Sequence, residues 1–195
     1  MYKYLIFLFI LFSCSDNIER TYYPSGELWT MGERINGKRE GDWIQFEVNG
    51  DTAFVTPYVN GLRHGVERQY DNNNVMSTWS YRLDTGHGLY QNFYPDGSLL
   101  NQGYKEKGYH VGEWTNYYNS GEIQSVALMK DEMPISETGY YRNGQVQFKI
   151  DDRTNGTYTF YDSLGGKLFE ATMKDGRLID TLFHHPNMPN LLTEE

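Results

Sequence analysis

Three histidines recur at a spacing that could build a metal site. His64, His87 and His110 follow one another at intervals of 23 residues. A zinc site needs four donor atoms within about 2 Å of the ion. If each interval is one unit of two strands, neighbouring histidines lie about 10 Å apart, too far to share an ion. The spacing therefore favours turn residues at one edge of a repeat array, and we expect no metal and no cofactor.

Catalytic signatures are absent from the sequence. It contains no Gly-x-Ser-x-Gly elbow, no phosphate-binding loop and no His-Glu-x-x-His motif. The single cysteine, Cys14, ends an apolar N-terminal segment, which argues against a nucleophilic role. Acidic residues are numerous, but they fall in turns or alternate along strands, as on a solvated face. We therefore expect that the protein is not an enzyme.

The N-terminal segment differs from the rest of the chain. Residues 1–13 carry one charge, Lys3, and an apolar run from Leu5 to Phe12. The run is too short for a transmembrane helix, which needs about 20 apolar residues, and is typical of an export signal. Leu11-Phe12-Ser13-Cys14 resembles the lipobox of bacterial lipoproteins, in which the cysteine carries the lipid.

This resemblance implies a lipoprotein signal peptide over residues 1–13 and lipidation of Cys14. It also implies a membrane-anchored protein of the bacterial cell envelope, in the periplasm or at the cell surface. An unlipidated cysteine after an ordinary signal is the alternative. With only one cysteine in the chain, no intrachain disulfide can form.

The net charge of the chain limits the kinds of partner that it can bind. The formal net charge is −9, and without residues 1–13 it becomes −10, because 16 basic and 26 acidic side chains remain. Such a surface repels phosphate backbones and anionic headgroups. We therefore expect no nucleic-acid partner, and membrane attachment only through an N-terminal lipid.

A motif of 23 or 24 residues recurs along the chain. Each copy has an opening residue, an aromatic residue five positions later, and a turn. The opening residues are Gly41, Gly65, Gly88, Gly112, Ile135 and Gly156, and the aromatic residues are Phe46, Tyr70, Phe93, Tyr117, Tyr140 and Tyr161. The turn positions are Gly26, Gly50, Asn74, Gly97, Gly121, Gly144 and Gly166. A period of this length indicates a repeat array.

Turn-forming pairs separate short aromatic strands. Asn49-Gly50 and Asp96-Gly97 tolerate the positive φ that tight hairpin turns need, and Asn36-Gly37 and Asn60-Gly61 do so at the opposite edge. We therefore predict an all-β fold, an elongated single-layer antiparallel sheet built from six to seven β-hairpin repeats. The expected organisation is a polar tether over residues 14–21, the array over 22–183 and a flexible tail over 184–195.

The array resembles MORN repeats, and in particular their bacterial variant. The resemblance is carried by Asn36 to Trp43 (Asn-Gly-Lys-Arg-Glu-Gly-Asp-Trp) and by Gly112 to Ile123 (Gly-x-Trp-x-x-Tyr-Tyr-x-x-Gly-x-Ile). It extends over roughly Tyr22 to Phe183. The bacterial variant occurs in proteins labelled as antitoxin components of polymorphic-toxin modules. The resemblance implies a binding scaffold with a protein partner, such as a toxin or an envelope protein.

The candidate binding face follows from the alternation of side chains along a strand. Alternation places one aromatic set, Trp43, Tyr90, Trp114 and Tyr158, on one face of the sheet. It places a second set, Phe46, Phe93, Tyr117 and Tyr161, on the other face. Stacking between repeats, recognition of a protein, and binding of a glycan or cell wall are the three possible roles of these rings.

Two further patterns weigh on these roles. The four tryptophans, Trp29, Trp43, Trp79 and Trp114, do not share one position in the repeat, which weakens the glycan interpretation. The copies depart from the motif at Glu67, Asn72 to Asn74, and Met133 to Glu137, and we expect specific recognition there. Sequence gives no oligomeric state.

Overall fold

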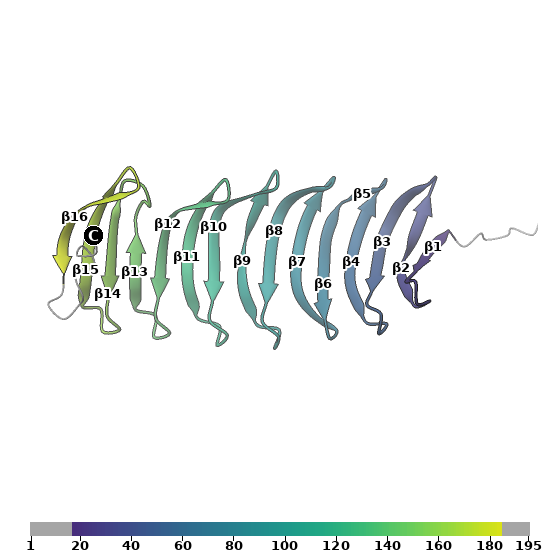
Figure 1. Ribbon diagram of the computed structural model, residues 1–195, viewed down its shortest axis with the longest axis horizontal. Helices are drawn as coiled ribbons and strands as arrows, with labels where there is room; N and C mark the ends of the chain where they lie inside the picture. The colour runs from purple at the N-terminus through teal and green to yellow at the C-terminus, as the bar shows by residue number, and fades with distance from the viewer. Residues whose placement is uncertain (1–16, 185–195) are drawn as a thin grey trace, which may run out of the picture.

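The computed structural model describes residues 17–184 and places them in one antiparallel sheet of 16 strands (Figure 1). Strand order follows the chain from β1 to β16, and the short β5 pairs with β4 beside this path. The first strands are β1 (Ile18–Tyr22), β2 (Leu28–Ile35), β3 (Lys38–Phe46), β4 (Thr52–Val59), β5 (Leu62–Arg63), β6 (Gly65–Asp71), β7 (Asn74–Arg82) and β8 (Thr85–Phe93). The others are β9 (Leu99–Glu106), β10 (Tyr109–Tyr117), β11 (Ile123–Lys130), β12 (Met133–Tyr140), β13 (Val146–Ile150), β14 (Thr157–Tyr161), β15 (Lys167–Lys174) and β16 (Arg177–His184).

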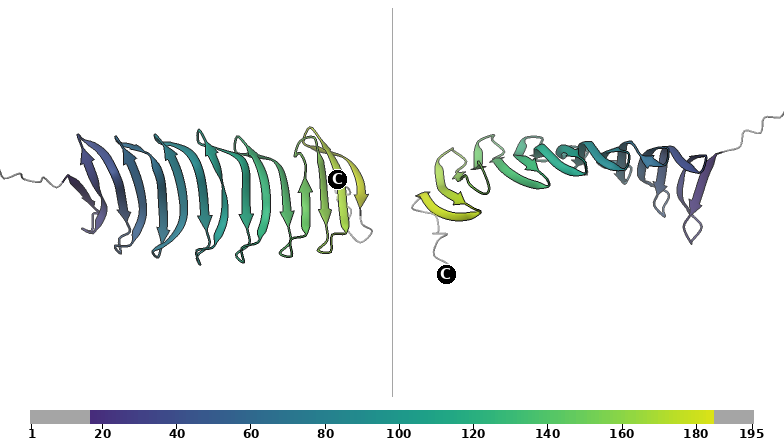
Figure 2. Two further views of the ribbon diagram at one scale, coloured as in Figure 1. Left: turned by 180° about the vertical axis from the view of Figure 1, so that it is seen from behind. Right: turned by 90° about the horizontal axis from the view of Figure 1, so that it is seen from above.

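The predicted all-β, single-layer array is confirmed. Seen from above, no second layer covers either face of the sheet (Figure 2). β1 and β16 lie at opposite ends of an elongated molecule (Figure 1). In the described part of the chain, no helix is long and apolar enough to cross a membrane.

Two kinds of turn close the hairpins at the two edges of the sheet. At one edge, three-residue loops end in glycine: the Glu47 N–H donates to Asp51 O at 2.8 Å, and the Gly50 N–H donates to Glu47 O at 2.9 Å. At the other edge, two-residue turns hold both residues at positive φ, as Asn36 (49°) and Gly37 (76°) do. We call this second edge the short-turn edge. Both geometries suit the right-handed twist of the paired strands.

Four connections depart from this chemistry, and one of them is the longer connection between β13 and β14, residues 151–156, none of which has a positive φ. On the short-turn edge, Leu83-Asp84 (φ 50° and 64°) and Asp131-Glu132 (49° and 70°) have no glycine. On the other edge, Asn72 and Asn73 have φ of 48° and 63°, and Asp71 pairs directly with Asn74. The departure seen in the sequence at Asn72 to Asn74 is therefore a two-residue turn in place of a three-residue loop.

Tyrosine side chains tie successive repeats together near the three-residue loops. Each tyrosine directly follows a repeat's recurring aromatic position and donates its hydroxyl to a backbone carbonyl of the next repeat. These bonds run from Tyr23 to Phe46 O (2.8 Å), Tyr94 to Tyr117 O (2.8 Å), Tyr118 to Tyr140 O (2.8 Å) and Tyr141 to Tyr161 O (2.9 Å). An isolated hairpin is marginal in water, so such ties help neighbouring repeats to stabilise one another.

The boundaries of the array differ from the prediction. Residues 18–21 belong to β1, which pairs with β2, and do not form a tether. Arg34 on β2 binds the Glu19 carboxylate on β1 and adds to the backbone pairing. His184 closes β16 and is not part of a tail. The predicted signal peptide, Cys14 and residues 185–195 lie outside the described residues.

Candidate binding face

One row of side chains crosses the sheet on a single face. Residues paired directly across antiparallel strands point to the same side, so the strand register traces the row. Its members are Trp43, Thr56, Glu67, Trp79, Tyr90, Gly103, Trp114, Ala127, Glu137, Ile150, Tyr158 and Ala171. We call the face that carries this row the aromatic face.

The four residues of the candidate binding face all lie in this row. Trp43 is only 3% exposed, so its ring packs within the protein and is not presented to a ligand. Tyr90, Trp114 and Tyr158 are half-buried and keep part of their rings accessible. That this face binds a ligand stays a prediction. Trp43 belongs to the face but is buried, so it supports the neighbouring side chains by packing.

The centre of the aromatic face is a cluster of stacked rings. Trp79 and Tyr90 lie with centroids 6.1 Å apart and planes 9° from parallel. Tyr90 lies 5.4 Å from Trp114, and the His110 ring lies 4.3 Å from Trp114. Such pairs add about 0.5–1.5 kcal/mol each beyond the area they bury. The cluster therefore joins β7, β8 and β10 into one rigid surface.

Cationic side chains lie over three rings of the aromatic face, those of Trp43, Tyr81 and Tyr90. The Arg39 guanidinium lies 4.2 Å from the centre of the Trp43 ring, and that of Arg63 lies 4.1 Å from the Tyr81 ring. The Lys105 amine lies 5.8 Å from the Tyr90 ring. Among residues 17–184, no carboxylate is within 4.0 Å of the charged groups of Arg39 or Lys105. Arg63 is paired with Asp84 at 3.2 Å, so Arg39 and Lys105 are the two cations on these rings without a close carboxylate in the described chain.

Two carboxylates interrupt the aromatic row, at positions where the sequence departs from the motif. Glu67 is 7% exposed, and its Oε2 accepts a hydrogen bond of 2.7 Å from Thr56 Oγ1. Glu137 pairs with Arg153 at 2.5 Å. Each carboxylate thus accepts a hydrogen bond from another side chain, Thr56 on β4 or Arg153 in the connection between β13 and β14, as buried polar groups require.

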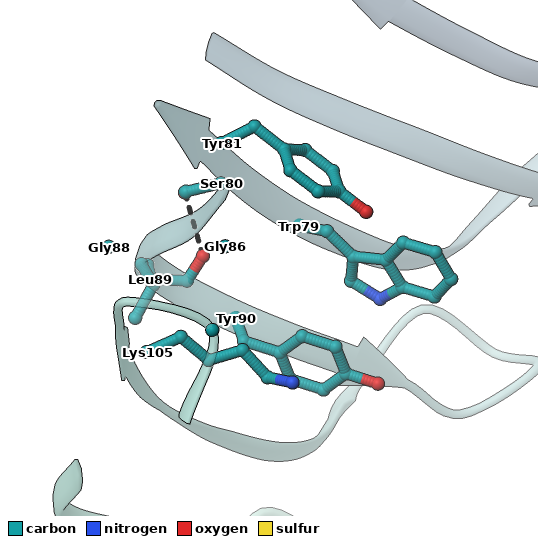
Figure 3. A pocket seen from close by; sticks show the side chains of 9 residues that line it. Trp79, Ser80, Tyr81, Gly86, Gly88, Leu89, Tyr90 and Lys105 are labelled. Atoms are coloured by element: carbon teal, nitrogen blue, oxygen red, sulfur yellow. Dashed lines mark hydrogen bonds between the residues drawn. The ribbon is translucent and has the colours of Figure 1, made fainter. Parts of the chain in front are cut away.

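A groove of about 320 Å³ opens on this face beside the ring cluster (Figure 3). Its walls are Trp79, Tyr81, Tyr90 and Lys105, and its other lining residues include Gly86, Gly88 and Gly108. Figure 3 labels the side chains of Lys105 and Tyr90 among those that line the groove. Nε1 of Trp79 is buried and has no hydrogen-bond partner in the described part of the chain. The groove thus combines flat apolar walls with one uncompensated positive charge.

Two titratable groups near the groove are shifted by their surroundings. Burial lowers the pKa of His110 below its usual 6.5, the charge of Lys105 lowers it further, and Glu132 acts in the opposite direction. Burial also raises the pKa of the Tyr81 hydroxyl, and the Glu67 carboxylate adds to this effect. Both shifts favour the neutral form of the side chain at neutral pH.

The three regularly spaced histidines are not brought together by the fold. His64 and His87 are exposed, whereas His110 is partly buried and its Nδ1 lies 2.9 Å from Glu132 Oε2. Over residues 17–184, no group of three or more His, Cys, Asp or Glu side chains could hold a metal ion.

Sequence reasoning missed three residues of this site. Trp79, Tyr81 and Lys105 form the groove, yet Tyr81 and Lys105 were not candidates, and Trp79 was considered only for glycan binding and not placed on the candidate face. Trp79 pairs with Tyr90 across β7 and β8, so three of the four tryptophans share the aromatic face although their positions in the repeat differ. Tyr58, Tyr81 and Lys105 each stand two positions after a member of the aromatic row on the same strand, namely Thr56, Trp79 and Gly103, and this common spacing was the available signal.

Comparison with known families supports the repeat assignment in the centre of the chain. The profile described as MORN repeat variant matches residues 86–104 and 111–131. These segments contain Tyr90, Tyr104 and Trp114, and the first of them ends one residue before Lys105. A comparison with curated proteins gives no match.

Proposed function

We propose that this protein is a non-enzymatic scaffold that binds a protein partner along the aromatic face. The observation that carries the proposal is the set of half-buried rings with cations over them, on a single layer that no other part of residues 17–184 covers. Tryptophan, tyrosine and arginine are the residues that contribute most often to binding energy in protein interfaces. A repeat array holds them in fixed positions over a long surface.

The proposal includes a place and a role. The lipobox-like segment supports a lipoprotein anchored in the cell envelope through Cys14. The match to the MORN repeat variant supports a binding role. The resemblance of the array to the bacterial variant suggests that this role is of the immunity or antitoxin kind. The partner would then be a toxin or another envelope protein.

Co-purification from native membranes tests the protein-binding proposal. The unaltered chain should retain a stoichiometric protein partner, and Tyr90→Ala should lose it while remaining folded. Tyr104→Ala is the matched control, because Tyr104 is 57% exposed and pairs with Leu89 and Val111, outside the aromatic row. Equal retention by both variants, or no partner in repeated preparations, would count against the proposal.

Acyl labelling tests the anchor independently of the partner. Cys14→Ser should abolish both labelling and membrane retention, because no other cysteine is present. Labelling that persists in this variant would exclude Cys14 as the lipidated residue.

The groove favours glycan or cell-wall binding as the second candidate. Parallel aromatic rings such as Trp79 and Tyr90 suit the flat face of a sugar. A glycan array and a peptidoglycan pull-down should then show retention that Trp79→Ala removes. Absence of retention by the unaltered chain eliminates this candidate.

A further inference from the structure

A contact made by a turn carboxylate recurs between neighbouring repeats along the short-turn edge. Asp84 is the second residue of its turn, and its Oδ1 accepts the Arg63 N–H at 2.9 Å and the Arg63 Nε–H at 3.2 Å. Glu132 is the second residue of a later turn, and it accepts the His110 N–H at 2.9 Å and pairs with His110 Nδ1 at 2.9 Å. In both places, a carboxylate from one turn binds the backbone N–H and the side chain of a residue in the preceding repeat.

The repeat between these two has glycine at both positions. Gly86 stands two residues before the opening Gly88, as Arg63 and His110 stand before theirs. Gly108 is the second residue of the turn Lys107-Gly108. Each of the two flanking repeats thus has a cationic or imidazole side chain facing a carboxylate, and this one has neither.

The backbone contact is kept where the carboxylate contact is lost. The Gly108 N–H donates to Gly86 O at 2.8 Å, just as the Asp84 N–H donates to Arg63 O at 2.9 Å. The φ of Gly86 is not positive, so the backbone does not require glycine there. A Cβ on Gly86 would meet only Lys105 Cδ, at 3.4 Å, and Gly108 Cα, at 3.6 Å, closer than 4 Å.

The N–H of Gly86 points to the place where the carboxylate would be. Arg82 and Thr85 flank the two-residue turn and form its hydrogen-bonded pair, so the next pair, Tyr81 with Gly86, is not hydrogen-bonded. The N–H and C=O of Gly86 therefore both face the neighbouring turn. The N–H of Gly108 donates to the C=O of Gly86, but Gly108 has no side chain that could accept the N–H of Gly86.

Lys105 supplies the positive charge that this repeat otherwise lacks. Its amine lies over the Tyr90 ring at 5.8 Å and has no carboxylate partner within 4.0 Å in the described chain. It forms a wall of the groove of about 320 Å³ that also contains Gly86 and Gly108. The other described turns with a glycine in this position are those of Gly37, Gly61 and Gly176. At Gly61, two turns before Gly108, Lys38 already lies against the space, 3.4 Å from where a Cβ would be.

We propose that the groove over Gly86 and Gly108 is a carboxylate-binding subsite, which takes a glutamate side chain of the partner protein. The carboxylate stands where Asp84 and Glu132 stand in the flanking repeats. It accepts the Gly86 N–H and pairs with Lys105, while its methylene groups lie against Tyr90. The protein source of the carboxylate rests on the proposed function, whereas the carboxylate chemistry does not.

NMR titration of the ¹⁵N-labelled full chain in detergent micelles tests the subsite. The probes are N-acetylglutamate amide, which has one carboxylate, its uncharged counterpart N-acetylglutamine amide, and acetate. The glutamate probe should move the Gly86 amide proton downfield saturably, because a charge-assisted hydrogen bond forms there. The glutamine probe should have no such effect. An equal shift from the glutamine probe, or no saturable shift from the glutamate probe, overturns the subsite.

Acetate separates the two sources of the carboxylate. It lacks the additional methylene group that would lie on Tyr90, so it should bind more weakly than the glutamate probe. If acetate binds as tightly as the glutamate probe, the assignment to a protein side chain is overturned.

Gly108→Asp restores the missing carboxylate within the chain. The φ of Gly108 is 91°, and Asp84 and Glu132 adopt 64° and 70° at the same position, so the turn accepts the change. The variant should show the Gly86 shift without any probe and should lose probe binding. Gly61→Asp is the matched control, with the same change in the same turn position two repeats away, and should bind the probe as the unaltered chain does. Probe binding retained in Gly108→Asp overturns the proposal.

Lys105→Gln tests the charge without changing a turn. This variant should bind the glutamate probe with about tenfold lower affinity, because a charge-assisted contact is lost. An unchanged affinity overturns the role of Lys105. A partner that co-purifies while no probe binds would refute the subsite and leave the proposed function standing. Probe binding by a chain that retains no protein partner would support the subsite and refute the proposed function.

Discussion

Gly103 lies directly beneath the indole of Trp114: a Cβ placed on Gly103 would come 2.0 Å from Trp114 Cε3. The same relationship joins Gly32 to Trp43 and Gly139 to Phe148, at 2.4 Å and 2.2 Å. None of these glycines has a positive φ, so the ring above each one, and not the backbone, requires the glycine. A single layer thus buries large rings by packing them on the backbone of the preceding strand.

Gly103→Ala should destabilise the protein by about 1–3 kcal/mol, the usual cost of overpacking a well-packed site. The added methyl group displaces the Trp114 ring from its position on the backbone of Gly103 and disturbs its contact with Tyr90. Urea unfolding followed by tryptophan fluorescence measures the change.

Gly86→Ala is the control for this prediction. Gly86 is also a strand glycine without positive φ, but the nearest atom to its Cβ would be Lys105 Cδ at 3.4 Å, on a flexible side chain. This variant should be neutral or more stable by up to about 1 kcal/mol, because alanine restricts the unfolded chain. An equal loss of stability in both variants would show that strand glycines matter here for another reason.

Tyr118→Phe should cost about 1 kcal/mol, the net contribution of a typical hydrogen bond. The hydroxyl of the half-buried Tyr118 donates to Tyr140 O at 2.8 Å and ties two repeats together. Tyr104→Phe should have no measurable effect, because Tyr104 is 57% exposed. Thermal unfolding of both variants decides the matter, and a neutral Tyr118→Phe would show that the ties do not couple the repeats.

The repeat period and the turn chemistry were enough to predict the sheet. Asn36-Gly37 and Asn60-Gly61 adopt the positive φ expected of them. The positions of rings within one strand were also predictable, because side chains alternate with a fixed period. These features depend only on local sequence.

Features that depend on strand register were not predictable. Trp79 joins the aromatic row because the register between β7 and β8 shifts between Trp79 and Tyr81. The segment 18–21 looked like a polar tether, since its pairing with β2 depends on a bulge between Thr21 and Tyr22. The groove depends on Gly86 and Gly108, which are 22 residues apart and each unremarkable alone. Bulges and the combination of distant positions are set by the assembled sheet.

Leu83→Asn should stabilise the protein by about 0.5–1 kcal/mol. Leu83 holds a φ of 50° in its turn and is 55% exposed, so its side chain gains little and the left-handed conformation costs about 1–2 kcal/mol. Asparagine tolerates this conformation. Leu164→Asn is the control, because Leu164 is 89% exposed without positive φ and should change stability by less than about 0.5 kcal/mol. Denaturant unfolding that shows no gain for Leu83→Asn would mean that the leucine makes a compensating contact.

Acidification should destabilise the protein through His110 between pH 7.5 and 5.5. Burial against Trp114 and the charge of Lys105 lower the pKa of His110 below 6.5, and Glu132 opposes them incompletely. The folded protein therefore binds fewer protons at this residue than the unfolded chain. Its contribution to stability is complete above about pH 6.5 and is lost as the pH falls toward the lowered pKa. The Asp84 carboxyl, whose pKa is held below 3.8 by the Arg63 N–H and guanidinium, acts only at lower pH.

His110→Gln should remove this part of the pH dependence, because glutamine does not titrate. The slope of unfolding free energy against pH should flatten between pH 7.5 and 5.5 in this variant, as measured by urea unfolding at several pH values. His64→Gln is the matched control, since His64 is exposed, and should keep the slope of the unaltered protein. If the unaltered protein instead becomes more stable on acidification in this range, the ion pair of His110 with Glu132 outweighs the burial of the ring.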